Sequence, residues 1–261
     1  MKKTLLLISL GLFIISCSSD DNNNGSDNNT VTETTDFLPE TTGNYWVYKT
    51  DTDGTAGRDS LYTDNDTVIG ANTYRKYRTA QLPSGFYSNT MNNNGVRKEN
   101  GKLLLTGGAS IAISEALPFN LAVTDFVIFD QNALPEEIMG TLSGTIDQEI
   151  QGLQVKFVYT LSSKAKADMA TYTVRGQPVY TNVKPVETTL NLSITVSGFP
   201  IMQPQNVLVS TQYYAEGIGV VFADTAINYQ LIDLSFLGIE LPIPTTGEQH
   251  QTEVLVDYQA E

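Results

Sequence analysis

The sequence predicts an all-β protein built on one large antiparallel meander sheet. Long runs of residues alternate between apolar and polar side chains at a period of two, which is typical of half-buried strands. Gly-containing pairs that suit tight turns separate these runs, and no long segment has a helical period. Because the runs recur roughly every 8 to 14 residues, we expect about ten to fourteen strands.

The alternation places the expected strands. Leu190–Ser197 has an aliphatic residue at every second position with a polar residue between, and Leu153–Leu161 repeats this pattern. Trp46–Tyr48 belongs to the first expected strand, Tyr229–Asp233 to a later one and Val254–Tyr258 to the last. All of these fall within residues 37–261, which we expect to form a single all-β domain.

Turn-forming residues interrupt the alternation between the expected strands. Asn, Asp and Gly accept the positive φ angles that tight hairpin turns require. The expected turns lie at Asp53-Gly54, Gly70-Ala71-Asn72, Asn94-Gly95, Asn100-Gly101 and Arg175-Gly176.

Two apolar stretches do not follow the meander pattern. Leu103–Leu134 is apolar, contains Gly and alternates poorly, so we expect a short irregular or helical insertion there between buried strands. An apolar flap over one face of the sheet is the alternative. Leu234–Pro244 contains prolines that suit a central strand poorly, and we expect an edge strand or a loop packed on the sheet.

The first sixteen residues have the layout of a secretory signal. Lys2 and Lys3 precede a mainly apolar run, Thr4–Ile15, and the small residue Ser16 follows it. A membrane-spanning helix needs roughly 20 apolar residues, so this run is too short to remain as an anchor. We therefore expect residues 1–16 to be a cleaved signal peptide.

Cys17 is the single cysteine of the chain and directly follows the expected signal. Ile14-Ile15-Ser16-Cys17 resembles the lipobox of bacterial lipoproteins, which implies lipidation of Cys17; an ordinary signal peptide without lipid is the alternative. The rest of the chain has no thiol for disulfides, catalysis or metal binding. Its stability must then come from burial of a core, for which the chain is long enough.

Residues 17–36 form an expected disordered tether. They are rich in Asn, Asp, Ser and Thr and contain no Lys or Arg, so they cannot bury enough apolar area to order themselves. The acidic residues Asp20 and Asp21 resemble the export signal of surface lipoproteins of the Bacteroidota. This resemblance favours an outer-membrane lipoprotein at the cell surface over one on the periplasmic face.

The charge balance is strongly acidic. The whole chain carries a net charge of −14, and loss of Lys2 and Lys3 with the signal would leave 13 basic and 29 acidic residues, a net charge of −16. Such a chain repels phosphate backbones, so we do not expect a nucleic-acid partner.

No motif nominates catalytic residues, a metal site or a cofactor. The single histidine, His250, stands without an evident catalytic or ligand partner and is expected to be exposed in a loop. Gly217 and Gly219 form a Gly-x-Gly pair, but Phe222 occupies the third position of a dinucleotide fingerprint, so a bend between strands is favoured. Asp51-Thr-Asp53-Gly54 lacks the later ligands of a calcium loop and is expected to be a hairpin turn.

Six basic residues fall close together in this acidic chain: Arg75, Lys76, Arg78, Arg97, Lys98 and Lys102. A solvated sheet face whose charges discourage edge pairing is the favoured interpretation, and an anion-binding patch is the alternative.

Several short segments together resemble a group of Bacteroidota envelope lipoproteins. They are Gly43–Tyr48, Asp66–Gly70, Thr73–Tyr77 and the Tyr-x-x-Gly-x-Gly segment within Tyr213–Gly219. The resemblance spans most of residues 37–235 and implies a curved, half-barrel-like sheet with a concave apolar face for an acyl chain or another hydrophobic ligand. It implies no catalytic residue.

Three further segments are similar to the Asp-Ser/Thr-aliphatic form of Bacteroidota O-glycosylation sites. They begin at Asp59, Asp66 and Asp224, and the modified residues would be Ser60, Thr67 and Thr225.

The resulting hypothesis is a non-enzymatic, lipid-anchored envelope protein that binds a hydrophobic small molecule in a curved sheet. A glycan-binding or adhesive surface protein with exposed aromatics such as Tyr45, Trp46 or Tyr87, or one that contacts an envelope protein, is the alternative. A hydrolase based on a carboxylate pair in a cleft is a further alternative.

Overall fold

The computed structural model describes residues 36–114, 117–150, 152–232 and 244–261. The expected signal peptide (1–16), the lipidation site Cys17 and residues 18–35 of the tether lie outside the described residues, as does nearly all of Leu234–Pro244. In the part of the chain that is described, no helix has the length and hydropathy needed to cross a membrane.

The described residues form thirteen strands and one short helix, which confirms the all-β prediction. Their bounds are β1 Tyr45–Thr52, β2 Thr55–Ile69, β3 Asn72–Thr79, α1 Phe86–Met91, β4 Gly95–Glu99, β5 Lys102–Ser114, β6 Leu117–Asp130, β7 Ile138–Ile150, β8 Leu153–Ala165, β9 Met169–Thr173, β10 Val179–Val196, β11 Phe199–Ala215, β12 Gly219–Gln230 and β13 Thr246–Gln259.

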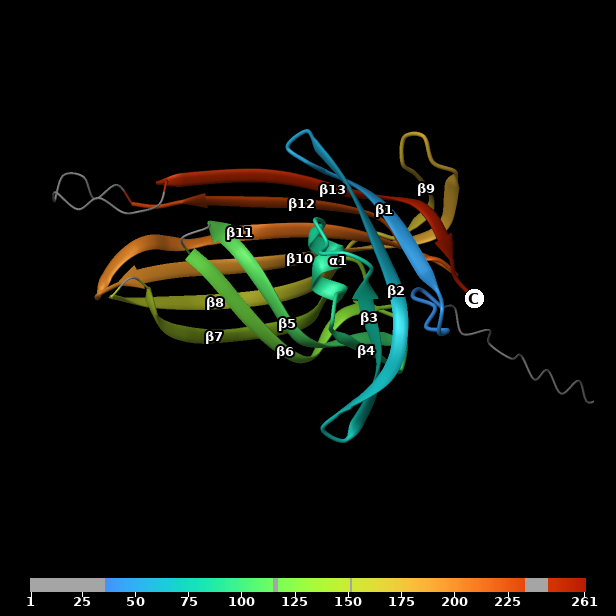
Figure 1. Cartoon of the computed structure of the whole chain (residues 1–261), viewed down its shortest axis with the longest axis horizontal. Coiled ribbons are helices and arrows are strands. Elements are labelled where there is room, and N and C mark those ends of the chain that lie inside the picture. The colour runs from blue at the N-terminus through green and yellow to red at the C-terminus, as the bar shows by residue number, and fades with distance from the viewer. Residues whose placement is uncertain (1–35, 115–116, 151, 233–243) are drawn as a thin grey trace, which may run out of the picture. The chain divides into compact units, whose positions relative to one another are not determined.

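All strands belong to one antiparallel sheet that curves until it is nearly closed like a barrel (Figure 1). The hydrogen-bonded order is β6-β5-β4-β3-β2-β1-β13-β12-β11-β10-β8-β7, with β9 paired to β10. The order is a meander from β1 to β6, and β1 pairs with β13 near the C-terminus. The two ends of this path, β6 and β7, are consecutive in the chain.

Strand β6, at one end of the path, contacts β7 and its neighbour β8, at the other end, through side chains and short distances. The Ser163 hydroxyl on β8 donates a hydrogen bond to the Val127 carbonyl of β6. Gly140 of β7 lies so near Val127 that an added Cβ would come within 3.0 Å of the same carbonyl oxygen. The Phe119 ring of β6 also packs on Phe157 of β8 at 5.5 Å. The curved sheet thus encloses its interior without a complete ring of backbone pairing.

Aromatic side chains fill one end of the enclosed interior. The segment before β1 brings Phe37 against Phe129 of β6 at 5.0 Å, and Phe129 packs on Tyr214 of β11 at 4.7 Å. Trp46 is fully buried there, and its indole Nε1 donates to the Ile218 carbonyl at 2.5 Å. Burial of this many large apolar side chains is the main source of stability in a domain without cysteines.

The strand predictions are confirmed at the runs with the clearest alternation. Leu190, Leu192 and Ile194 of β10 face the core with no exposed surface. Phe157 and Leu161 of β8 are also buried, with 0% and 8% of their surface exposed, and more exposed residues lie between them.

Four of the five predicted turns connect consecutive strands, namely those at Asp53-Gly54, Gly70-Ala71-Asn72, Asn100-Gly101 and Arg175-Gly176. The prediction at Asn94-Gly95 was wrong, because Gly95 already begins β4 and the residue with positive φ is Asn93. The predicted turn at Asp51–Gly54 forms, and the Gly54 amide donates to the Asp51 carboxylate at 2.9 Å.

The predicted helical insertion exists at a different place from the one expected. Leu103–Leu134 consists mainly of two long paired strands, β5 and β6, rather than irregular or helical structure. Its register shifts three times along this pair, which explains why the alternation is poor in the sequence. The short helix is α1, which lies earlier in the chain, between β3 and β4.

Candidate functional site

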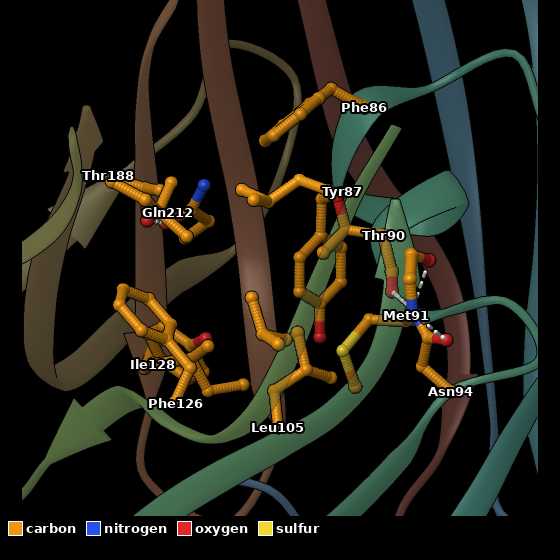
Figure 2. Close-up of a pocket in the computed structure, with 15 residues that line it drawn as sticks. Phe86, Tyr87, Thr90, Met91, Asn94, Leu105, Phe126, Ile128, Thr188 and Gln212 are labelled. Carbon is orange, nitrogen blue, oxygen red and sulfur yellow. Dashed lines mark hydrogen bonds between the residues drawn. The ribbon is translucent and has the colours of Figure 1, made fainter. Parts of the chain in front are cut away.

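Helix α1 lies against the inner side of the curved sheet and forms one wall of a pocket (Figures 1 and 2). It has only six residues, and its N-cap residue, Gly85, supplies no side-chain capping bond. An isolated helix of this length is unstable in water. The surrounding strands must therefore hold α1 in place.

Three side chains from distant strands satisfy the amide groups at the start of α1. Asp59 of β2 accepts from the Ser84 and Gly85 amides, and Gln251 of β13 accepts from the Phe86 amide at 2.5 Å. Glu253 of β13 accepts from the Tyr87 amide at 2.5 Å and from both the amide and the hydroxyl of Ser88. These bonds replace the capping that the local sequence lacks.

Glu253 is an ionisable group in the protein interior, with only 1% of its surface exposed. Burial raises the pKa of its carboxyl to about 7, although the hydrogen bonds from Ser88 and Tyr87 act in the opposite direction. The nearby Asp59 carboxylate raises this pKa further. The stability that this group contributes therefore depends on pH in the range around neutrality.

The pocket lies between α1 and strands β5, β6, β8, β10 and β11 (Figure 2). Its lining is almost wholly apolar and includes Leu105, Leu121, Phe126, Ile128, Leu161 and Tyr214. The cavity has a volume of about 60 Å³, and one side is partly open to solvent. No charged side chain belongs to the lining, which consists of described residues only.

A few polar side chains interrupt the apolar lining. The Asn94 side-chain amide donates to the Thr90 and Gly108 carbonyls at 2.7 and 2.9 Å. The Gln212 amide nitrogen donates to Ser210 at 2.7 Å, and its oxygen accepts from Thr188 at 3.4 Å. Asn94 and Gln212 therefore bond to neighbouring protein groups.

Asp59 and Glu253 are buried carboxylates close to α1, and both oxygens of each accept hydrogen bonds. Each carboxylate oxygen accepts at least one hydrogen bond from Ser84, Gly85, Tyr87 or Ser88. Neither residue belongs to the lining of the apolar pocket. Both carboxylates therefore hold the start of α1 in place.

His250 lies on strand β13 rather than in a loop, and it has a partner that the sequence did not reveal. The register of β12 and β13 brings its Nε2 to 2.6 Å from the Asp224 carboxylate on the outer surface. Both side chains are largely exposed, at 60% and 46%. Among the described residues, no group of three or more His, Cys, Asp or Glu side chains is placed to hold a metal ion.

The clustered basic residues pair with carboxylates, as expected for a solvated sheet face. Five of the six form ion pairs, namely Arg75 with Asp66, Arg78 with Asp64, Arg97 with Asp125, Lys98 with Asp36 and Lys102 with Asp130. The Arg97 side chain makes two bonds to Asp125, which lowers the pKa of that carboxyl. These pairs leave little free positive charge for an anion.

The aromatic residues proposed for a glycan-binding surface are mostly inside the protein. Trp46 has no exposed surface and Tyr87 has 4%, while Tyr45 is half-buried. The exposed aromatics that would favour the glycan-binding alternative are therefore not found at Trp46 and Tyr87, because both point into the curved sheet.

The three glycosylation candidates lie in different environments. Thr225 is buried, with 2% of its surface exposed, and its hydroxyl bonds to Ser210 at 2.7 Å, which disfavours its modification in the folded protein. Ser60 and Thr67 are half-buried on β2, and their modification stays a prediction.

Sequence reasoning missed α1 and the side chains that hold it. The sequence did contain a sign that Glu253 is buried. Glu253 lies two residues before Leu255 in β13, so both side chains point to the inner face of the sheet. An acidic residue at an inward position indicates a buried hydrogen-bonded group. Asp59 occupies the equivalent position beside Leu61 on β2.

The fold and the pocket define a class of protein: a nearly closed antiparallel β-sheet with a helix and an apolar cavity inside. Comparison with family models, with curated proteins and with solved structures gives no match to this chain.

Proposed function

We propose that this chain is a lipid-anchored envelope protein, without catalytic activity, that binds a small hydrophobic ligand inside its curved sheet. The observation that carries the ligand proposal is the apolar pocket between α1 and β5, β6, β8, β10 and β11. Ligand sites are typically concave and mostly apolar with a few polar groups, which is the composition of this pocket. The lipoprotein signal at Cys17 supports the anchor.

The size of the pocket limits the ligand. An engineered apolar cavity of about 150 Å³ holds benzene, whereas this pocket offers about 60 Å³ before any adjustment. A long acyl chain therefore requires α1 to move outward or must project through the open side. A compact molecule fits with smaller changes.

Native mass spectrometry of unlipidated protein purified from its own host tests the ligand proposal. We expect a bound apolar molecule whose mass persists under gentle ionisation and is lost on unfolding. Repeated preparations without any apolar ligand, under conditions that retain a known weak ligand on a control protein, would contradict the proposal.

The anchor is tested by replacing Cys17 with alanine. Lipidation contributes about 0.8 kcal/mol per buried CH₂ group to membrane binding, so its loss should move the protein from the membrane to the soluble fraction. Cell fractionation with immunoblotting measures this change, and Ser18→Ala is the matched control. A Cys17→Ala protein that stays with the membrane would show that another feature anchors it.

We further propose an outer-membrane location with the folded domain at the cell surface. The support is the acidic segment at Asp20 and Asp21 and its resemblance to surface-export signals. Digestion of intact cells by an added protease measures the exposure: a surface protein is degraded, and one on the periplasmic face is protected.

A further inference from the structure

Two residues that line the apolar pocket have buried hydroxyl groups without a hydrogen-bond partner among the described residues: Tyr87 (Oη) and Thr90 (Oγ1). Both atoms are buried, and Tyr87 as a whole has only 4% of its surface exposed. The Tyr48 hydroxyl donates to the Val220 carbonyl at 2.8 Å, and its interaction with the Tyr87 hydroxyl, which is the smallest contribution to the raised pKa of Tyr87, does not reach hydrogen-bond geometry. Leaving a buried hydroxyl unpaired costs about 1–3 kcal/mol, so most buried polar groups in native proteins have partners.

The two hydroxyls come from one face of α1. Tyr87 and Thr90 are three residues apart, and Met91 follows Tyr87 by four, so all three side chains lie on the same side of the helix. Figure 2 shows this side of α1 facing Leu105 and Phe126 across the pocket. The unpaired groups thus belong to the face of the helix that forms this wall of the pocket.

The charge of the lining restricts what such a molecule can be. No charged residue lines the pocket, so an ionised ligand would lose its hydration without a compensating charge. A hydrocarbon would leave both hydroxyls unpaired. An uncharged molecule with an apolar body and one hydrogen-bonding group meets both conditions.

We propose that the pocket binds a compact neutral amphiphile whose polar group hydrogen-bonds to the Tyr87 and Thr90 hydroxyls. This inference rests on the proposed function, because it specifies the class of ligand for the same cavity. The hydroxyls act as positioning donors and acceptors, and the apolar walls supply most of the affinity.

Phenol and toluene test this proposal because they share one shape and differ in a hydroxyl against a methyl group. Binding of each to the full-length Cys17→Ala chain is measured by calorimetry or NMR titration at neutral pH. The same titrations are made with the double variant Tyr87→Phe/Thr90→Val, which removes both hydroxyls and keeps the shapes of the side chains. The variant's melting temperature and its toluene affinity report whether the pocket remains folded.

We expect the double variant to bind phenol about five- to tenfold more weakly than the parent and to bind toluene with unchanged affinity, since one hydrogen bond contributes about 1 kcal/mol. If phenol affinity is unchanged in the variant, the cavity binds apolar molecules but the hydroxyls play no part, and only this inference is overturned. If neither compound binds the parent chain, this inference is overturned, whereas the proposed function is overturned only if native mass spectrometry also finds no apolar ligand.

Discussion

Replacing Glu253 with glutamine should remove this residue's share of the pH dependence of the protein's stability between about pH 4.5 and 7. Burial raises the pKa of this carboxyl to about 7 in the folded state, above its ordinary value of 4.5. In this range the folded protein holds a proton that the unfolded chain has released. The group's contribution is therefore complete below pH 4.5 and is lost as the pH rises through about 7.

The size of this effect follows from the shift of the pKa. A change of one pKa unit corresponds to about 1.4 kcal/mol, so the shift of Glu253 accounts for about 3 kcal/mol of unfolding free energy between pH 4.5 and 8. Urea denaturation of the parent and Glu253→Gln chains at both pH values measures it. Between pH 4.5 and 8, the unfolding free energy of Glu253→Gln relative to that of the parent should rise by about 3 kcal/mol.

Glu248→Gln is the matched control for this comparison. Glu248 lies on the same strand, β13, but is exposed, so its replacement makes the same Glu-to-Gln change without changing the interior. Its unfolding free energy should follow the parent at every pH. Glu40 also has a pKa raised to about 7 by burial, but it is present in all three chains and cancels in the differences. Parallel pH profiles for the parent and Glu253→Gln would show that Glu253 does not carry a buried proton.

The strands were predictable because their signal is local. In β10 from Leu190 to Ile194, the polarity of each side chain indicates which face of the sheet it lies on. This alternation is visible in the sequence without knowledge of the neighbouring strands. The β5–β6 pair was harder to predict because its register shifts break the alternation at several positions. The sequence shows such a segment as apolar and irregular, although both strands are paired along most of their length.

The pocket was not predictable from the sequence because its helix depends on distant partners. The α1 segment, Phe-Tyr-Ser-Asn-Thr-Met, is short and contains weak helix formers. Its amides are satisfied by Glu253, which is more than 160 residues away in the chain. The contact between His250 and Asp224 has the same origin, because it follows from the register of β12 on β13. Interactions of this kind become visible only when the sheet is assembled.

Replacing Trp46 with alanine should produce the largest loss of stability among the single substitutions considered. Trp46 has no exposed surface, packs against Tyr77 at 6.1 Å and donates its indole proton to the Ile218 carbonyl. Gly219 approaches so closely that an added Cβ would lie 3.1 Å from the indole nitrogen. Because no neighbouring backbone can easily move into the space, we expect a loss of about 3–5 kcal/mol in the free energy of unfolding.

Denaturant unfolding of Trp46→Ala, Trp46→Phe and Tyr258→Ala separates the causes of this loss. Trp46→Phe keeps part of the ring volume but leaves the Ile218 carbonyl unpaired, so its cost should be intermediate. Tyr258 pairs with Trp46 across β1 and β13 but is 41% exposed, and its replacement should cost much less. Trp46 does not line the apolar pocket, so the folded fraction of each variant should bind ligand as the parent does. A Trp46→Ala chain as stable as Tyr258→Ala would mean that the aromatic end of the sheet is not its stabilising core.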